Sequence, residues 1–307
     1  MAYNENMRSL KRISILATIL LSILTYGNIL DQIPPQDQVN QAASYEEIEQ
    51  AVAYLDFQHA NGTSTKGTGV LVGENWILTA AHVAQSAANK ENQTAIFGGN
   101  SSSSYKIVEW VIHPEWTGDV NTGMKYDYAL GRLETPVSGI GPVSMYEGKT
   151  SDLVGEEVTL LKFDNSSDPF KVVAGSNVVD GTAVNTEQGP MTNLLVTDYD
   201  TNDSSSNLMG SVNATANEFN ITAGDSGSPL FVKDDSGYKL VGVTSAMLAL
   251  ASGDSQDMAA FVSFGQESDP IFGVKELVKA KAVPEPSTMI ITMTSLLGLM
   301  LRKKKSC

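Results

Sequence analysis

Residues 224–230 read Gly-Asp-Ser-Gly-Ser-Pro-Leu, so that Ser226 has one glycine two residues before it and another directly after it. Glycine adopts backbone conformations that other residues avoid, and this string permits the tight turn that an exposed nucleophile needs. The N–H groups of Gly224 and Ser226 can then point together at a developing oxyanion. Such a string alone is most often only a turn. It indicates a nucleophile when the chain also supplies a base and a group that orients the base.

Two further strings supply those groups. Residues 78–83 read Leu-Thr-Ala-Ala-His-Val, where an apolar run ends in two small residues followed by His82. The small residues leave room for an imidazole to lie in a cleft. Residues 126–130 read Tyr-Asp-Tyr-Ala-Leu and contain Asp127. An aspartate alone is usually a solvated loop carboxylate, but with a histidine and a serine it completes the set that amide hydrolysis requires.

The three strings, in this chain order, resemble the three signatures of the chymotrypsin-like serine peptidase family. Residues 113–116, His-Pro-Glu-Trp, are similar to a His-Pro-x-aromatic segment that often precedes the family's aspartate. Residues 240–245, Leu-Val-Gly-Val-Thr-Ser, are similar to the strand that pairs with the substrate backbone. The resemblance covers roughly residues 50–280. It implies an all-β fold of two six-stranded antiparallel β-barrels with the active site between them.

The resemblance also implies catalytic roles. Ser226 attacks the peptide carbonyl and forms an acyl-enzyme, and His82 acts as general base and then as general acid. Asp127 holds the neutral tautomer of His82 and stabilises its cation, while the N–H groups of Gly224 and Ser226 form the oxyanion hole. We therefore expect a serine endopeptidase that acts on protein or peptide substrates without a cofactor. The alternative is a catalytically weak surface binding module, because a fold does not guarantee an activity.

Three positions are expected to bind substrate. Family members that cleave after Arg or Lys carry an Asp six residues before the nucleophile, whereas this chain has Asn220 there. Trypsin-like specificity is therefore not expected. Ser245 corresponds to the serine behind the triad. Two residues later, Met247 stands where the family often has Gly, so a large side chain narrows the primary pocket and favours small or medium P1 residues.

The mode of activation is open. In members made as zymogens, a freed Ile or Val N-terminus pairs with the aspartate just before the nucleophile, which here is Asp225. No Ile-Val-Gly-Gly string occurs near residues 41–52. The sequence therefore leaves the partner of Asp225 unassigned.

The hydrophobic pattern independently indicates an antiparallel barrel or sandwich, because short apolar runs alternate with clusters of Gly, Asn, Asp and Ser. A short C-terminal amphipathic helix is expected at residues 272–282, where apolar residues alternate with lysines. The runs expected to be strands are 52–57, 69–72, 76–79, 105–112, 157–163, 194–196, 229–232, 240–244 and 260–264.

The N-terminal region has the layout of an exported protein. Residues 1–27 place basic residues ahead of an apolar stretch at 13–24, which is typical of a secretory signal peptide. An uncleaved membrane anchor is the alternative. Residues 28–50 are polar and are expected to be a linker or propeptide, followed by the peptidase domain at 51–283.

The tail at residues 284–307 has three parts, which are Pro-Glu-Pro at 284–286, an apolar segment at 289–301 and a basic end at 302–305. It resembles the PEP-CTERM sorting signal of Gram-negative bacteria and some cyanobacteria, which an exosortase removes. The resemblance implies an exosortase-like processing partner and transient membrane association through the tail. A plain tail anchor is the alternative. Both place the body outside the cytoplasm, in the periplasm, at the cell surface or in an extracellular matrix.

Composition argues against several other classes of protein. The net charge is -15, and because both ends are basic the middle carries about -20, which should repel nucleic acid phosphates. The single cysteine, Cys307, allows neither an intramolecular disulfide nor a cysteine nucleophile in the body. Three scattered histidines show no zinc-ligand spacing. The segment with Asp198, Asp200 and Asp203 fits a solvated acidic loop better than a calcium site.

Overall fold

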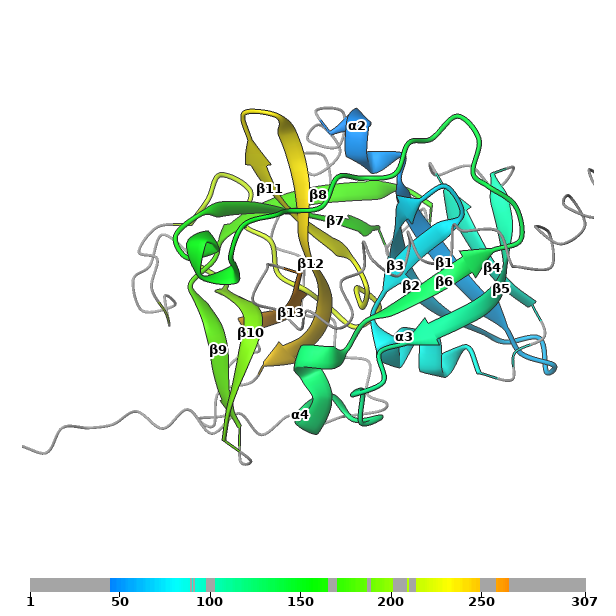
Figure 1. Ribbon diagram of the computed structural model, residues 1–307, viewed down its shortest axis with the longest axis horizontal. Helices are drawn as coiled ribbons and strands as arrows, with labels where there is room; N and C mark the ends of the chain where they lie inside the picture. The colour runs from blue at the N-terminus through cyan, green and yellow to red at the C-terminus, as the bar shows by residue number, and fades with distance from the viewer. Residues whose placement is uncertain are drawn as a thin grey trace, which may run out of the picture. The chain divides into compact units, whose positions relative to one another are not determined.

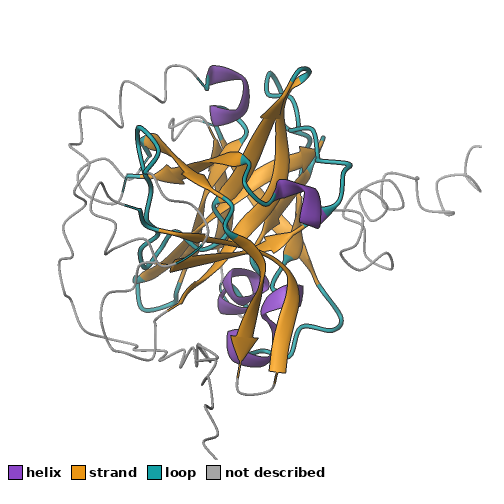
Figure 2. Ribbon diagram, turned by 90° about the vertical axis from the view of Figure 1, so that its left-hand side faces the viewer, coloured by secondary structure: helices purple, strands orange, loops and turns teal. Residues whose placement is uncertain are grey.

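The computed structural model describes residues 45–264 apart from 89, 91, 98–102, 165–169, 187–188, 201–208, 210–213 and 249–257. The chain divides into two compact units, Met1–Ser268 and Asp269–Cys307, and every described residue lies in the first. This part consists of antiparallel strands with a few short helices (Figure 1, Figure 2). The expected signal peptide, C-terminal helix and sorting tail lie outside the described residues. Within those residues, no helix is both long and apolar enough to cross a membrane.

The N-terminal half is a closed barrel with the strand order β1-β2-β3-β6-β5-β4. It closes because β1 has a partner on each side, with Val52 opposite Val70 of β2 and Ala53 opposite Phe97 of β4. Inward-facing residues such as Phe57 are fully buried, and each contributes ~1.5–3 kcal/mol of hydrophobic stabilisation. The strands are β1 (Val52–Gln58), β2 (Ser64–Gly73), β3 (Trp76–Thr79), β4 (Asn92–Phe97), β5 (Ser104–Ile112) and β6 (Ala129–Leu133).

The C-terminal half is a seven-stranded antiparallel sheet with the order β8-β7-β11-β12-β13-β10-β9. β8 at one end of the sheet approaches β10 near the other end, since Asp180 N donates to Val196 O at 2.9 Å and Asn177 Nδ2 donates to Asp198 O at 2.7 Å. The sheet therefore curls on itself, with β9 as an additional strand. The strands are β7 (Glu157–Phe163), β8 (Val172–Val178), β9 (Gly181–Thr186), β10 (Gly189–Asp198), β11 (Pro229–Asp234), β12 (Gly237–Leu248) and β13 (Met258–Ser263).

The helices are short and lie at the ends of strands or in connections. In Figure 1, α4 lies between the barrel and the curled sheet. Met124 at the start of η1 is fully buried in a cluster with Leu194, Met258 and other residues of the C-terminal half, so it pins this connection to that half. The segments are α2 (Glu46–Glu49), α3 (Ala81–Ser86), α4 (Val120–Gly123), η1 (Met124–Tyr126) and η2 (Thr150–Leu153).

The expected all-β fold is confirmed, and the N-terminal half is the expected six-stranded barrel, whereas the C-terminal half is a sheet of seven strands rather than six because β9 is added to it. Eight of the nine predicted apolar runs lie wholly within strands, and the ninth, 260–264, extends one residue beyond β13. Four strands were not predicted, namely β4, β6, β8 and β9. In β6, Gly131 interrupts the apolar pattern, but it lies where two large side chains approach the backbone. A Cβ there would come within 2.7 Å of Trp110 and 2.9 Å of Ile77, so only glycine fits without a shift.

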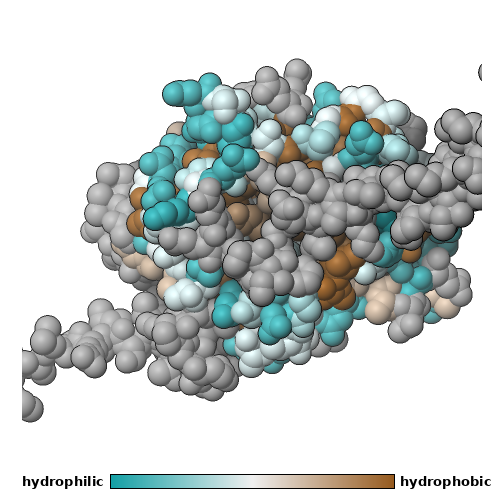
Figure 3. Space-filling model, in the orientation of Figure 1, coloured by the Kyte–Doolittle hydropathy of each residue, from teal (hydrophilic) through white to brown (hydrophobic). Residues whose placement is uncertain are grey.

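The two halves pack against each other through aromatic residues, and the outer surface is mixed. Tyr54 of β1 and Phe163 of β7 make an edge-to-face contact, with ring centroids 5.4 Å apart. On the face shown in Figure 3, polar residues surround small separate apolar patches. The large hydrophobic side chains exposed among the described residues are Val108 and Val154.

Candidate active site

His82 lies in the first turn of α3, directly after β3. Ala80 is extended with ψ 146°, and Ala80 and Ala81 are fully buried, so the two small residues let the chain turn tightly against the barrel. A helix start leaves N–H groups without partners, and Ala80 has no side-chain group that accepts one. Asp127 does so instead, because its Oδ1 accepts a hydrogen bond from His82 N at 2.8 Å.

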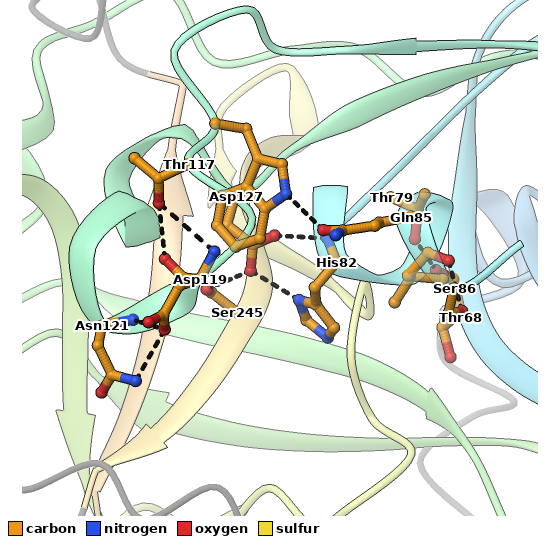
Figure 4. A network of polar contacts seen from close by, with 12 residues as sticks. Thr68, Thr79, His82, Gln85, Ser86, Thr117, Asp119, Asn121, Asp127 and Ser245 are labelled. Atoms are coloured by element: carbon orange, nitrogen blue, oxygen red, sulfur yellow. Dashed lines mark hydrogen bonds and ion pairs between the residues drawn. The ribbon is translucent and has the colours of Figure 1, made fainter. Parts of the chain in front are cut away.

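Asp127 follows η1 and is fully buried. Its Oδ2 accepts hydrogen bonds from His82 Nδ1 at 2.8 Å and from Ser245 Oγ at 2.6 Å. Figure 4 shows Asp127 between His82 and Ser245, which belongs to β12 of the other half. A buried carboxylate is costly unless its oxygens are hydrogen-bonded, and these three donors meet that need. The arrangement fixes both position and tilt of the His82 ring.

Neighbouring aromatic residues hold the segment that carries Asp127. His113 is 3% exposed and stacks on Tyr126, with ring centroids 4.8 Å apart and planes 12° from parallel. Its Nδ1 accepts a hydrogen bond from Glu115 N at 3.1 Å. Trp116 Nε1 donates to Gln85 Oε1 at 2.9 Å, which ties the same segment to α3. His113 therefore has a packing role.

Ser226 lies in a turn with two glycines at positive φ, Gly224 at +104° and Gly227 at +82°. From residue 224 to residue 227, every second backbone N–H group donates a hydrogen bond. Asp225 N donates to Thr222 O at 3.1 Å and Gly227 N donates to Thr244 O at 2.9 Å. Among the described residues, no acceptor takes the N–H of Gly224 or of Ser226. These are the two groups that the sequence predicted for an oxyanion hole.

The turn is docked on the barrel next to the strand that leads to His82. Thr68 N of β2 donates to Ser226 O at 3.0 Å, and Thr79 Oγ1 of β3 donates to Thr68 O at 2.6 Å. A Cβ on Gly227 would overlap both Thr68 O and Thr79 Oγ1. Only a glycine therefore allows this contact, which brings Ser226 to the half that carries His82.

The three expected substrate-binding residues lie at different places in the C-terminal half. Asn220 is half-buried, and its Oδ1 accepts a hydrogen bond from Ile221 N at 2.8 Å. The side chain of Ser245 is directed at Asp127, whereas Met247 is half-buried against the hydrophobic core. From Ala246 to Leu248, β12 pairs with β13 on one edge, and no described strand pairs with the other edge from Ser245 onward. An extended peptide can add to such an edge.

Several site residues could not be found from the sequence. Thr68 and Thr79 support the Ser226 turn, and Lys162 of β7 places its Nζ 3.0 Å from Asp225 Oδ2. A threonine or lysine within an apolar strand gives no local signal of such a role. Asp225 lies 63 residues from Lys162 in the chain, so only the fold reveals the pair.

The expectation of a solvated acidic loop is wrong for two of its three residues. Asp198, the last residue of β10, is 1% exposed and Asp200, two residues later, is 2% exposed, while Asp203 lies outside the described residues. Near them, burial raises the pKa of Glu218 to about 7, and the charge of Asp200 adds to the rise, although hydrogen bonds from Thr215 oppose it. The described residues hold no group of three or more His, Cys, Asp or Glu side chains arranged for a metal ion.

Two curated proteins are similar to part of the chain. Complement C1r-A subcomponent of Mus musculus is 33% identical over 93 residues, which are 26% of this chain and 13% of that protein. Calcium-dependent serine proteinase of Mesocricetus auratus is 36% identical over 83 residues, which are 24% of this chain and 12% of that protein. The chain thus spans only a small part of the length of these relatives.

Two solved structures share the fold of this chain, and a comparison with family models shows which family the chain belongs to. A Glu endopeptidase in complex with MPD has a TM-score of 0.51 at 19% identity, covering 76% of this chain and 91% of that one. The protease Anisep from Arthrobacter nicotinovorans has a TM-score of 0.50 at 16% identity, covering 74% and 96%. At these low sequence identities, the two matches show a shared fold and nothing more. The sequence model of the trypsin family matches residues 46–264, and the chain therefore belongs to the trypsin family.

Proposed function

We propose that this protein is an exported serine endopeptidase that hydrolyses peptide bonds through an acyl-enzyme, with Ser226, His82 and Asp127 as its catalytic triad. The observation that carries the proposal is the buried Asp127 carboxylate, which accepts hydrogen bonds from His82 N, His82 Nδ1 and Ser245 Oγ. This arrangement is what a general base needs for orientation. The docked Ser226 turn adds a nucleophile candidate in the neighbourhood of the same histidine.

The chemistry follows from the donors and acceptors. An ionised Asp127 only accepts hydrogen bonds, so Nδ1 of His82 carries the proton and Nε2 keeps a lone pair. Nε2 takes the hydroxyl proton of Ser226 as Oγ attacks the peptide carbonyl, and Asp127 stabilises the imidazolium that forms. His82 then returns the proton to the leaving amine. A water molecule hydrolyses the acyl-enzyme by the same proton transfers in reverse, which regenerates the Ser226 hydroxyl.

The oxyanion hole belongs to the N–H groups of Gly224 and Ser226. Both lack an acceptor among the described residues, whereas the intervening N–H of Asp225 is already used. Donors that are fixed before the reaction stabilise the tetrahedral oxyanion without reorganisation, and losing one such donor typically costs ~10²–10³ in kcat.

Substrate binds as an additional strand. The edge of β12 at Ser245–Leu248 has no described strand partner, and a peptide can pair there in extended conformation. Asn220 at the primary pocket carries no charge that would select Arg or Lys, and Met247 limits the size of the P1 side chain. We therefore assign protein or peptide substrates with small or medium P1 residues.

Export is proposed from the two ends of the chain. The signal-like residues 1–27 and the PEP-CTERM-like tail at 284–307 favour delivery to the periplasm, cell surface or extracellular matrix, with an exosortase-like enzyme as processing partner. Cell fractionation with the full chain and with a chain lacking residues 284–307 tests this. Retention of both forms in the cytoplasm would contradict it.

The nucleophile is tested by labelling the full chain with a fluorophosphonate, which reacts with activated serines. The wild type and Ser236→Ala are expected to become labelled, because Ser236 lies exposed in the turn between β11 and β12. Ser226→Ala is expected to remain unlabelled. A folded wild type that neither labels nor cleaves a peptide library would contradict the proposal and favour a binding module on the same fold.

A further inference from the structure

The carboxylate next to the candidate nucleophile has a cation built into the fold. Asp225 directly precedes Ser226, its side chain is 1% exposed, and its Oδ2 lies 3.0 Å from Nζ of Lys162. The Lys162 side chain, near the end of β7, is itself only 11% exposed. A buried carboxylate persists only when it is paired and hydrogen-bonded. Lys162 supplies the opposite charge that Asp225 requires.

The paired carboxylate also holds the shape of the turn. Asp225 Oδ2 accepts hydrogen bonds from Thr222 N at 2.7 Å and from Thr222 Oγ1 at 3.2 Å. The backbone of Asp225 closes the same turn, since its N donates to Thr222 O and its O accepts from Ser228 N. Gly224 and Ser226 flank this residue on either side. An Asp225 side chain that rotated out to water would therefore reorient the two N–H groups assigned to the oxyanion hole.

Lys162 belongs to β7, a strand that has a partner strand on each side. β7 pairs with β8 along its whole length and with β11 from Val158 to Leu160. β11 begins at Pro229, three residues after the candidate nucleophile, so the strand that carries the cation and the turn that needs it share one sheet. Lys162 Nζ also donates to Asn220 O at 3.2 Å, which links the cation to the candidate P1 position.

We propose that Lys162 is a positioning residue that keeps the oxyanion-hole turn in its competent conformation, so that the chain is active without cleavage to create a new N-terminus. This inference rests on the proposed peptidase function. It assigns to an internal side chain the charge that the turn requires, and it makes activity independent of processing in residues 41–52.

The first test uses the full wild-type chain. The chain is labelled with a fluorophosphonate, and the labelled species is identified by intact mass. We expect labelling of molecules that retain residues 41–52 uncut. Labelling confined to molecules with a new N-terminus inside that segment would overturn the inference while leaving the proposed function standing. Absence of any labelling would instead contradict the proposed function.

The second test compares kcat and KM of folded variants. Lys162→Met is expected to lower kcat by about 100-fold, the loss associated with one oxyanion-hole donor, while changing KM by less than about threefold. Lys162→Arg keeps the charge and is expected to recover at least about tenfold of that loss. Lys171→Met is the control, because Lys171 is a half-buried lysine of the same half whose Nζ lies 3.9 Å from Oδ2 of a different carboxylate, Asp164.

A purely structural role for Lys162 predicts a different result. In that case Lys162→Met would lower the melting temperature but leave kcat per folded molecule within about twofold of the wild type and of Lys171→Met, which would overturn the inference. If Lys162→Met fails to fold, Lys162→Met combined with Asp225→Asn removes both buried charges. Because this double variant lacks the ion pair between residues 162 and 225, we expect its kcat to remain below that of Lys162→Arg. Equal kcat values would likewise overturn the inference.

Discussion

Gly227→Ala should separate the docking of the Ser226 turn from the conformational freedom of glycine. Gly227 has φ +82°, and an added Cβ would overlap Thr68 O and Thr79 Oγ1 of the barrel. Gly62 has nearly the same φ, +81°, in the turn after β1, and an added Cβ there meets no atom within 4 Å. Gly62→Ala is therefore a matched control that shares the backbone strain but not the close contact.

The magnitude follows from two contributions. An alanine at such positive φ costs ~1–2 kcal/mol in either variant. The overlap with two barrel atoms adds a further ~1–3 kcal/mol to Gly227→Ala, as forced overpacking does. Since ~1 kcal/mol shifts the melting temperature of a domain of this size by ~2–4 °C, Gly227→Ala should melt several degrees below Gly62→Ala. It should also lose activity, because Ser226 moves with its neighbour.

Thermal melts followed by circular dichroism, and kcat/KM on a peptide ester, provide the assay. Gly62→Ala is expected to retain the wild-type kcat/KM, while Gly227→Ala loses at least about tenfold, because a displacement of reacting groups by about 1 Å already costs that much or more. Equal melting temperatures and equal kcat/KM in the two variants would refute the docking of this turn on β2 and β3.

Three further predictions concern charge. Asp127→Asn removes the negative charge that orients and stabilises the His82 ring, so kcat should fall by ~10⁴ with little change in KM, and steady-state kinetics that show a loss below tenfold would contradict the role of Asp127. Asn220→Asp should raise cleavage after Arg and Lys by about tenfold in a peptide-library digest; the gain is limited because Lys162 Nζ lies 3.2 Å from the backbone oxygen of this residue. The pKa of Glu218 is raised to about 7 from its ordinary value of 4.5. At a pH between these two values, the Glu218 carboxyl keeps its proton in the folded protein and has lost it in the unfolded chain. The melting temperature should therefore fall from pH 5 to pH 8, and Glu218→Gln should show a smaller fall; identical pH profiles would exclude the contribution of Glu218.

Much of the fold was predictable from local patterns. The nine runs assigned to strands are short, apolar and bounded by turn residues, so their local preference agrees with their place in the sheets. β6 and β8 were missed because glycine and polar residues interrupt them. At Gly131, close packing against Trp110 and Ile77 overrides the poor strand preference of glycine. The burial of Asp198 and Asp200 was missed for a similar reason, because their composition resembles that of a surface loop.

The sequence alone identified His82, Asp127 and Ser226 as candidates, because each lies in a short string whose composition suits its chemistry. Tertiary structure decided how such residues meet. Asp127 lies 45 residues from His82 and 118 residues from Ser245, and the two halves must pack before one carboxylate can accept from both. The pairing of Lys162 with Asp225 was likewise decided by the fold. A single lysine in a strand has no local pattern, and its role arises only when the curled sheet brings β7 beneath the turn.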